Sequence, residues 1–299
     1  MHYLGVDMGG SATRWVCCDA KGRIRAEGVS PGATGLVFSD DARRVFLAAL
    51  EPIRAALPGP VTRAVLGLTG VGLDADPSIT ALIAQGLGLD AAQVTFCNDM
   101  VLAWHAAFSR SPGHLVSAGT GSVGLSVDDA GRVTLVGGRG TLIDDAGSGA
   151  WIALRALDAV YRRIDAHGAA TGAEVLARHL FAAMGGDDWD TTRRFVYGAE
   201  RGALGLLAAP VAAAAHAGDP VALDLMARAG QELARLARAL LARCGPAPVA
   251  VVGGVLALHP LVRTTMIAQV PDAALDFPIL NAAARAADLA RGPLPKDLA

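Results

Sequence analysis

Residues 7–11 of the chain read DMGGS, in which a carboxylate precedes two glycines and a hydroxyl. Asp7 ends an apolar run typical of a buried strand, so the glycines are expected to form the turn that follows it. Glycines let backbone N–H groups approach an anion, and Ser11 adds a hydroxyl donor. Taken alone, this stretch is compatible with a plain turn between strands or with a phosphate-binding loop.

A similar pattern begins at residue 114 and strengthens the phosphate interpretation. Residues 114–138 again run through an apolar strand, a glycine-rich turn (119-GTGS-122), a second strand and a turn ending in Gly-Arg. The repetition predicts two related β-rich lobes. Two such hairpins could hold a triphosphate between them. The Asp7 carboxylate would then need a cation beside the phosphates, and Mg²⁺ is the natural choice.

Other nucleotide motifs are excluded or disfavoured. Lysine occurs only at positions 21 and 296, so no glycine cluster has the lysine of a P-loop or of a protein kinase. Residues 119-GTGSVG-124 match the dinucleotide fingerprint, but the following residues alternate and meet a second turn. This pattern predicts a hairpin, whereas the fingerprint requires a helix.

Two further segments carry candidate site residues. Residues 249–255 (VAVVGGV) predict a buried strand ending at two glycines, which suits close approach of a flat group such as adenine or ribose. The pair 98-ND-99 follows another predicted strand. Asn and Asp are preferred helix caps, and a carboxylate at this place could also serve as a general base.

The composition favours small-molecule partners. The formal net charge of -2 gives no field for nucleic acid or for an anionic membrane. The four cysteines form no C-x-x-C pair, the histidines lack metal-ligand spacing, and the N-terminus does not resemble a signal peptide. The longest alanine-rich run is too short to span a bilayer. We therefore expect a cytoplasmic protein.

Hydrophobic periodicity predicts an alternation of strands and helices. Strands are expected at 2–8, 13–19, 23–29, 62–68, 93–97, within 114–138 and at 248–252. Helices are expected at 41–57, 77–87, 99–108, 149–166, 172–184, 188–199, 201–217, 219–244 and 280–291. In the first helix the apolar face would contain Val45, Phe46, Ala49, Leu50 and Ile53. The lobe boundary is expected at 110–113.

Together these motifs resemble the sugar kinase–Hsp70–actin superfamily. More narrowly they resemble the N-acetylglucosamine/glucosamine kinase family, which also includes activator ATPases of the benzoyl-CoA reductase type. The matching segments are 7-DMGGS-11, 98-ND-99, 118-AGTGS-122, 137-GGRGTLIDDAGSG-149, 217-AGDP-220 and 253-GGV-255.

The resemblance implies an α/β fold with two actin-like (ribonuclease H-like) lobes, a central cleft and a helix-rich second lobe. Residues 1–112 would form the N-terminal ATPase lobe. Residues 113–299 would form the C-terminal lobe with a helical insertion, and its last helix is a candidate to pack back on the first lobe.

The resemblance also implies roles for individual residues. ATP and Mg²⁺ would be the cofactors, an amino sugar the substrate, and the protein a homodimer. Asp99 would be the general base and Asp7 would position the metal. Nucleotide contacts would come from Gly9, Gly10, Ser11, Gly119, Thr120, Gly121, Ser122, Gly253 and Gly254. Sugar contacts would come from Thr34, Asn98, Asp99, Gly138, Arg139 and Asp145, with Asp144 as the neighbouring alternative to Asp145.

Three positions depart from the family pattern. The N-acetylglucosamine kinases commonly have tryptophan where Arg139 stands and glutamate where Ala146 stands, and Thr34 falls where the family often has asparagine. Arg139 resembles the G-G-R form associated with bacterial glucosamine kinases. The resemblance therefore favours glucosamine, phosphorylated at its 6-hydroxyl, with N-acetylglucosamine as the alternative substrate.

An alternative function of another class is that of a regulatory or activator ATPase with little kinase activity. The departures at Arg139 and Ala146 leave this alternative open. The activator ATPases use cysteines that bridge subunits through an iron–sulfur cluster. Cys97 has no second cysteine at a suitable spacing. This absence disfavours the activator branch.

Overall fold

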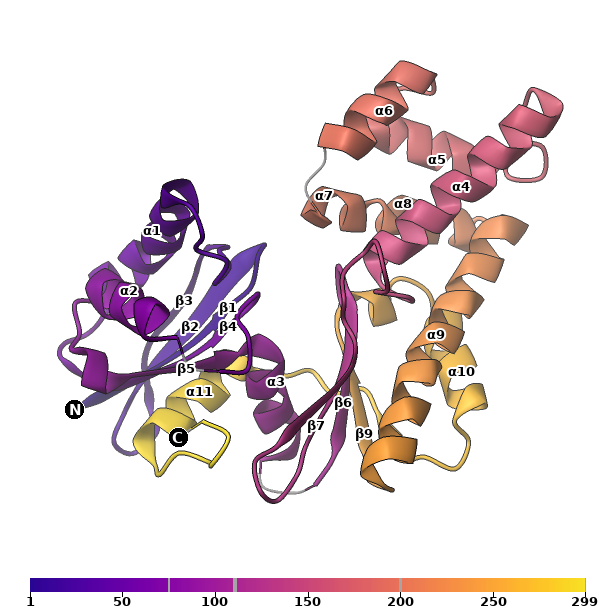
Figure 1. Ribbon diagram of the computed structural model, residues 1–299. Helices are drawn as coiled ribbons and strands as arrows, with labels where there is room; N and C mark the ends of the chain where they lie inside the picture. The colour runs from indigo at the N-terminus through magenta and orange to yellow at the C-terminus, as the bar shows by residue number, and fades with distance from the viewer. Residues whose placement is uncertain (75, 110–111, 199–200, 299) are drawn as a thin grey trace. The chain divides into compact units, whose positions relative to one another are not determined.

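The computed structural model describes residues 1–74, 76–109, 112–198 and 201–298, without the side chain of Arg201. Its contacts divide the chain into two compact units (Figure 1). Unit 1 contains Met1–Pro112, Val127–Val133 and Ile279–Ala299, and unit 2 contains Gly113–Ser126 and Thr134–Pro278. Two positions of the predicted boundary, 110 and 111, lie outside the described residues.

Unit 1 is built on a sheet with the strand order β3-β2-β1-β4-β5. Its strands are β1 (His2–Met8), β2 (Ala12–Asp19), β3 (Ile24–Pro31), β4 (Val61–Leu68) and β5 (Val94–Asn98). The first three form an antiparallel meander, and β4 and β5 run parallel to β1. The carboxyl ends of β1, β4 and β5 therefore meet at one edge of the sheet.

Helices cover both faces of this sheet (Figure 1). They are α1 (Asp40–Ala56), α2 (Pro77–Leu87), α3 (Asp99–Phe108) and α11 (Ala282–Arg291), with a 3-10 turn, η1, at Ala91–Gln93. Phe46 and Ile83 of α1 and α2 pack with Leu4 and Val6 of β1, whereas α11 packs against the opposite face. The predicted apolar face of α1 is confirmed except at Val45, which is 56% exposed, because the sheet contacts only the narrower stripe behind it.

Gly5 brings α11 into backbone contact with β1. A Cβ atom at Gly5 would lie 2.1 Å from both the Ala283 carbonyl oxygen and the Ala287 nitrogen, so no other residue fits there. Side chains alternate along a strand, so Asp7 is on the same face as Gly5. Asp7 thus belongs to the face of the sheet that α3 and α11 cover.

Unit 2 repeats the same sheet topology, in the order β10-β9-β6-β7-β8. Its strands are β6 (His114–Ala118), β7 (Ser122–Val127), β8 (Val133–Gly137), β9 (Val249–Val252) and β10 (Leu275–Asp276). Here β6 and β7 are antiparallel, and β9 and β10 run parallel to β6. The matched orders confirm the predicted α/β class with two related lobes.

The rest of unit 2 is mainly helical. The helices are α4 (Gly149–His167), α5 (Glu174–Met184), α6 (Trp189–Gly198), α7 (Arg201–Leu206), α8 (Ala208–His216), α9 (Pro220–Cys244) and α10 (Pro260–Gln269), with a 3-10 turn, η2, at Gly254–Ala257. The helix expected at 201–217 is wrong as one element. It divides because Pro210 has no N–H to donate and its ring clashes with the carbonyl of residue 206. The sequence analysis did not predict α10 or β10. Residue 199, the last of the helix expected at 188–199, lies outside the described residues.

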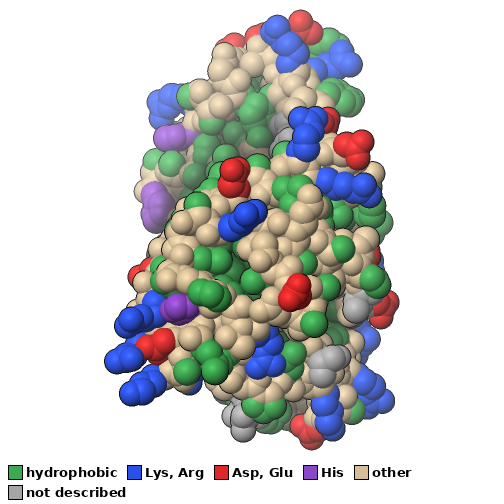
Figure 2. All heavy atoms as spheres, turned by 90° about the vertical axis from the view of Figure 1, so that its left-hand side faces the viewer, with side chains coloured by type: hydrophobic (Ala, Val, Ile, Leu, Met, Phe, Trp, Pro, Cys, Tyr) green, Lys and Arg blue, Asp and Glu red, His purple; other side chains and the backbone are tan. Residues whose placement is uncertain are grey.

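The surface carries charges of both signs. On the face shown in Figure 2, Lys and Arg side chains are interspersed with Asp and Glu side chains. This agrees with the small net charge of -2. Within the described residues, no helix has the length and apolar character needed to cross a membrane.

Candidate active site

In unit 1, polar side chains gather at the edge where three parallel strands end. Asp7 lies near the end of β1, Thr69 follows β4, and Asp99 follows β5. The register aligns Asp7 with Gly67 and Gly67 with Cys97, so these ends are level. The carboxyl edge of such a sheet is where α/β proteins bind ligands.

Asn98 and Asp99 make different contacts at the start of α3. The Asn98 side chain caps α3 by accepting a hydrogen bond from the Met100 N–H (2.9 Å), and it donates to the Val71 carbonyl (2.8 Å). Asp99 is the first residue of the helix, and its carboxylate accepts a hydrogen bond from the Thr69 hydroxyl. Asn98 therefore caps α3, and the Asp99 carboxylate is held by Thr69, the residue that follows β4.

The two carboxylates are electrostatically unusual. Burial raises the pKa of Asp7 to about 6, the neighbouring charge of Asp99 adds to the shift, and Arg14 opposes it. Burial also raises the pKa of Asp99, while hydrogen bonds from Thr69 and Met100 act in the opposite direction. A carboxylate with a raised pKa is a stronger proton acceptor, which suits a general base.

The predicted phosphate loop of unit 1 is tightly built. The Gly9 N–H donates to the Ala12 carbonyl (3.1 Å), and the Gly9 carbonyl accepts from Ala33 N–H (3.1 Å). A Cβ at Gly32 would lie 2.3 Å from the Gly10 carbonyl oxygen, and a Cβ at Gly10 would lie 3.7 Å from the Thr34 methyl. The structure therefore brings Thr34 beside the loop that contains Gly9, Gly10 and Ser11.

In unit 2, the turn between β6 and β7 is fixed by the start of α4. The Gly149 and Ala150 N–H groups donate to the carbonyls of Gly119 (2.9 Å) and Thr120 (3.2 Å). Gly119 also donates to the Gly121 carbonyl (2.9 Å). A Cβ at Gly119 would meet no atom within 4 Å, so one side of this rigid turn is open.

Ser122 makes a side-chain hydrogen bond to the segment that contains Asp145. Its side chain is buried, and its hydroxyl donates to the Ala146 carbonyl (2.7 Å). The hydroxyl predicted to contact phosphate thus holds the segment after Asp145 in this structure.

Gly253 and Gly254 lie next to that turn, because β9 runs parallel to β6 and pairs Val252 with Ser117. Gly253 has φ +112° and ψ 160°, and a Cβ there would lie 2.3 Å from the Ala118 carbonyl oxygen. Only glycine adopts this backbone readily. A Cβ at Gly254 would meet nothing within 4 Å, which leaves that side accessible.

The segment 137–149 lies along the same end of unit 2. Gly137, Gly138 and Gly140 all have positive φ, and a Cβ at Gly138 would lie 2.8 Å from the Val123 side chain. Asp145 also has positive φ, 55°, which is uncommon for a residue other than glycine. Its side chain is fully buried and accepts a hydrogen bond from the Thr141 hydroxyl (3.3 Å).

Arg139 and Asp144 form an ion pair within this segment. The guanidinium of Arg139 lies 3.4 Å from the Asp144 carboxylate, and Arg235 of α9 lies 3.7 Å from the other carboxylate oxygen. The Asp144 side chain is 13% exposed and the Arg139 side chain 64%. Asp144 is therefore compensated by two arginines, and Arg139 extends over the surface.

The residues fit Mg²⁺ bound together with a nucleotide. Among the described residues, no group of three or more His, Cys, Asp or Glu side chains could hold a metal ion. Mg²⁺ commonly uses one or two carboxylates and completes its shell with phosphate oxygens and water. A cation beside Asp7 would offset the repulsion between Asp7 and Asp99.

Comparison with known proteins identifies the family. Residues 4–277 match the model of the BadF/BadG/BcrA/BcrD ATPase family. The chain belongs to this family. The match confirms the predicted resemblance, and no curated protein matches the chain.

Solved structures with this ATPase fold include a candidate N-acetylglucosamine kinase from Chromobacterium violaceum. It is 26% identical, with a TM-score of 0.79 over 97% of this chain and 98% of that one. A second such candidate, from Porphyromonas gingivalis, is 14% identical (TM-score 0.67, 97% and 98% covered). A ROK family glucokinase from Streptomyces griseus, in complex with glucose and AMPPNP, is 19% identical (TM-score 0.57, 97% and 99% covered). The last two comparisons show the fold alone.

Sequence reasoning missed two residues of these sites. Thr69 had a usable signal, because 66-LGLTG-70 places a hydroxyl and a glycine directly after a predicted strand. Arg235 had none, because it lies in the middle of α9 and resembles any surface arginine of a helix.

Proposed function

We propose that the chain is an ATP-dependent kinase that transfers phosphate to an amino sugar, with glucosamine favoured and the 6-hydroxyl as acceptor. The observation that carries this proposal is the Asp99 carboxylate, which is partly buried, has a raised pKa and is oriented by Thr69. Its place at the sheet edge near Asp7, together with membership of an ATPase family, supports phosphoryl transfer.

Asp99 acts on the acceptor hydroxyl. The sugar oxygen forms a bond to the γ-phosphorus as the bond from phosphorus to the ADP oxygen breaks, and Asp99 accepts the hydroxyl proton. The Thr69 hydroxyl restricts rotation of the carboxylate, so one oxygen faces the acceptor throughout. When bound, Mg²⁺ supplies positive charge to the phosphates, and Asp7 is the residue placed to hold it.

The glycine turns bind the nucleotide. The Gly9 and Gly119 N–H groups are bonded within their own turns and fix the shape of these turns. The remaining backbone N–H groups of Gly9–Ser11 and of Gly119–Ser122 contact phosphate, and Gly253 with Gly254 contacts adenosine. The open space beside Gly119 and Gly254 supports these roles, because a ligand can approach the backbone there. Thr34, Asn98, Gly138, Arg139 and Asp145 contribute to the sugar site.

Arg139 supports glucosamine as the acceptor. It stands where the N-acetylglucosamine kinases commonly have tryptophan, and its guanidinium pairs with Asp144 instead of offering an aromatic surface to an acetamide methyl. N-acetylglucosamine is the second candidate, since the Chromobacterium violaceum relative is described as a candidate kinase for that sugar. We also propose a cytoplasmic homodimer, as the family resemblance implies.

A coupled assay of ATP consumption with glucosamine, N-acetylglucosamine and glucose tests the proposal. We expect glucosamine to give the highest kcat/KM and its 6-phosphate as product, identified by NMR. Asp99→Asn should lower kcat by at least ~100-fold, with ATP affinity changed less than ~3-fold. Asp40→Asn, at an exposed carboxylate of α1, is the matched control. Turnover that no sugar stimulates would instead favour the regulatory or activator ATPase.

A further inference from the structure

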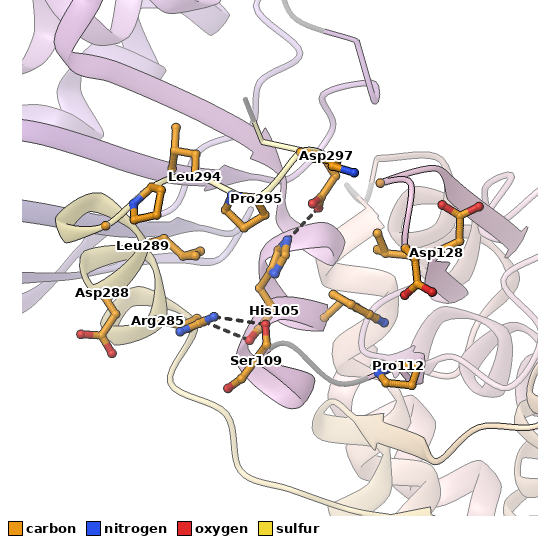
Figure 3. A pocket seen from close by; sticks show the side chains of 17 residues that line it. His105, Ser109, Pro112, Asp128, Arg285, Asp288, Leu289, Leu294, Pro295 and Asp297 are labelled. Carbon is orange, nitrogen blue, oxygen red and sulfur yellow. Dashed lines mark hydrogen bonds and ion pairs between the residues drawn. The ribbon is translucent and has the colours of Figure 1, made fainter.

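Helix α3 is attached at both ends, and its far end contacts the last residues of the chain. His105 Nε2 donates to the Asp297 carboxylate (2.7 Å), and Arg285 of α11 donates to the carbonyls of His105 (3.1 Å) and Ser109 (3.3 Å). Figure 3 shows these contacts around the end of the helix. Because Asp99 is the first residue of α3, they act on the helix that carries the proposed base.

The His105–Asp297 pair is buried and incompletely satisfied. The two side chains are 3% and 5% exposed. A carboxylate only accepts, so Nε2 carries the hydrogen, and Nδ1 is buried with no hydrogen-bond partner among the described residues. A buried polar atom without a partner costs free energy, and apolar side chains of similar size could fill this space without that cost. Stability alone therefore does not account for the pair, whereas a requirement for one defined geometry does.

The pair lies beside a cavity, although both of its side chains are almost fully covered. His105 and Asp297 line a cavity of about 440 Å³, bounded by the end of α3, the turn 128–131, α11 and the segment 292–297 (Figure 3). The directional hydrogen bonds to Asp297 and from Arg285 restrain this end of α3.

The same C-terminal segment is fixed to the strand that carries Asp7. Gly5 lets α11 contact β1 through the backbone, and Arg285 of α11 binds the end of α3. Contacts from β1 to α11 and from α11 to α3 thus link the element that carries Asp7 to the helix that carries Asp99. Burial raises the pKa of the Cys97 thiol in β5, and the charges of Asp297 and Asp99 add to this shift, so the charge of Asp297 is also felt at the end of β5.

We propose that His105 and Asp297 are positioning residues, whose pair fixes α3 so that Asp99 meets both Thr69 and the acceptor hydroxyl. This inference rests on the proposed kinase function. Asp99 itself is the catalytic residue, and the pair acts only through the helix.

Kinetics of matched variants test this role. Asp297→Ala should lower kcat about 10-fold while KM for ATP changes less than ~2-fold, because the glycine loop at Gly9 does not depend on α3. Asp297→Asn keeps an oxygen that can accept from Nε2, so its kcat should stay within ~3-fold of wild type. Asp288→Ala removes an ion pair of α11 that does not contact α3, and should leave kcat unchanged. Wild-type kcat in Asp297→Ala, or losses that only follow the folded fraction, would overturn the proposal.

Hydrogen exchange tests the anchor without relying on kinase activity. In Asp297→Ala and in the milder His105→Gln, amides of α3 should exchange at least ~10-fold faster, while those of α1 keep their wild-type rates. Equal protection of α3 in wild type and variants would refute the anchor. If wild-type protein shows no sugar-dependent turnover but α3 loses protection as expected, the proposed function fails and the anchoring contact stands, without its role in catalysis.

Discussion

Thr69, the residue after β4, donates its hydroxyl hydrogen to Asp99, the first residue of α3. This contact joins two neighbouring parallel strand ends through side chains. It lowers the pKa of Asp99 while burial raises it, so the residue is a carboxylate whose basicity is set by two opposing effects.

Removing the Thr69 hydroxyl should therefore shift the pH dependence of turnover. Without the hydrogen bond the pKa of Asp99 rises further, and the base is active only when ionised. In Thr69→Val, the acid limb of the kcat profile should therefore move to higher pH. Thr69→Ser, which keeps the hydroxyl, is the control. If the acid limb of the kcat profile does not shift in Thr69→Val, Asp99 is not the base whose titration gives that limb.

Asp7 should lower the stability of the ligand-free protein at neutral pH. Its folded pKa of about 6 lies above the ordinary 3.8, so the folded state prefers the neutral carboxyl. The stability from that preference is present at low pH and is lost as pH rises through 6. Asp7→Asn should raise the Tm by about 2 °C or more at pH ~8 and less at pH ~5, measured by calorimetry. Addition of Mg²⁺ and ATP should raise the Tm of wild type more than that of the variant. A lower Tm for the variant at both pH values contradicts this account.

Two adjacent glycines should respond differently to the same substitution. Gly253→Ala forces an alanine into φ +112° and against the Ala118 carbonyl, and should reduce the free energy of unfolding by at least ~2 kcal/mol. Gly254→Ala meets open space, so its urea unfolding curve should match wild type. Its ATP affinity, measured by calorimetry, should nevertheless fall about 10-fold, because the methyl group occupies the space proposed for adenosine. Unchanged affinity in Gly254→Ala would exclude this adenosine contact.

Cysteine reactivity should distinguish one thiol from the other three. Cys244 is exposed at the end of α9, whereas Cys17 and Cys18 are buried in β2. Burial raises the pKa of Cys17 to about 11 and also raises that of Cys97, which disfavours the reactive thiolate. A thiol reagent should label one site rapidly in the native protein, and Cys244→Ser should abolish that phase. In denaturant all four cysteines should react at similar rates.

The repeated sheets could be predicted because their turns use local chemistry. Asp19 accepts hydrogen bonds from the Lys21 and Arg23 N–H groups, and Asp128 accepts the same bonds from Ala130 and Arg132. Such turns are encoded within five residues, and the strands on either side alternate regularly. For the same reason the helix bounds around Asp99 and Asp219 were close to those observed.

Contacts between distant segments could not be predicted from pattern. Nothing near Thr69 specifies that β5 will pair with β4, and nothing near His105 specifies a partner 192 residues away. The ion pair between Arg139 and Asp144 also depends on a loop with positive φ at several glycines, and its path is set by packing against Val123. The sequence therefore identified candidate site residues, but the residues that they contact could be identified only from the folded structure.

The contact between Gly5 and α11 has a consequence for how the chain folds. It joins β1 to residues 283–287, across a separation that includes all of unit 2. Contacts of such high sequence separation form slowly, because the intervening chain must be ordered or looped out first. During synthesis, the part of the unit 1 sheet that α11 covers must therefore wait until residue 291 has left the ribosome. Unit 2 can bury its helices around its own sheet before then, so a segment made after unit 2 completes unit 1.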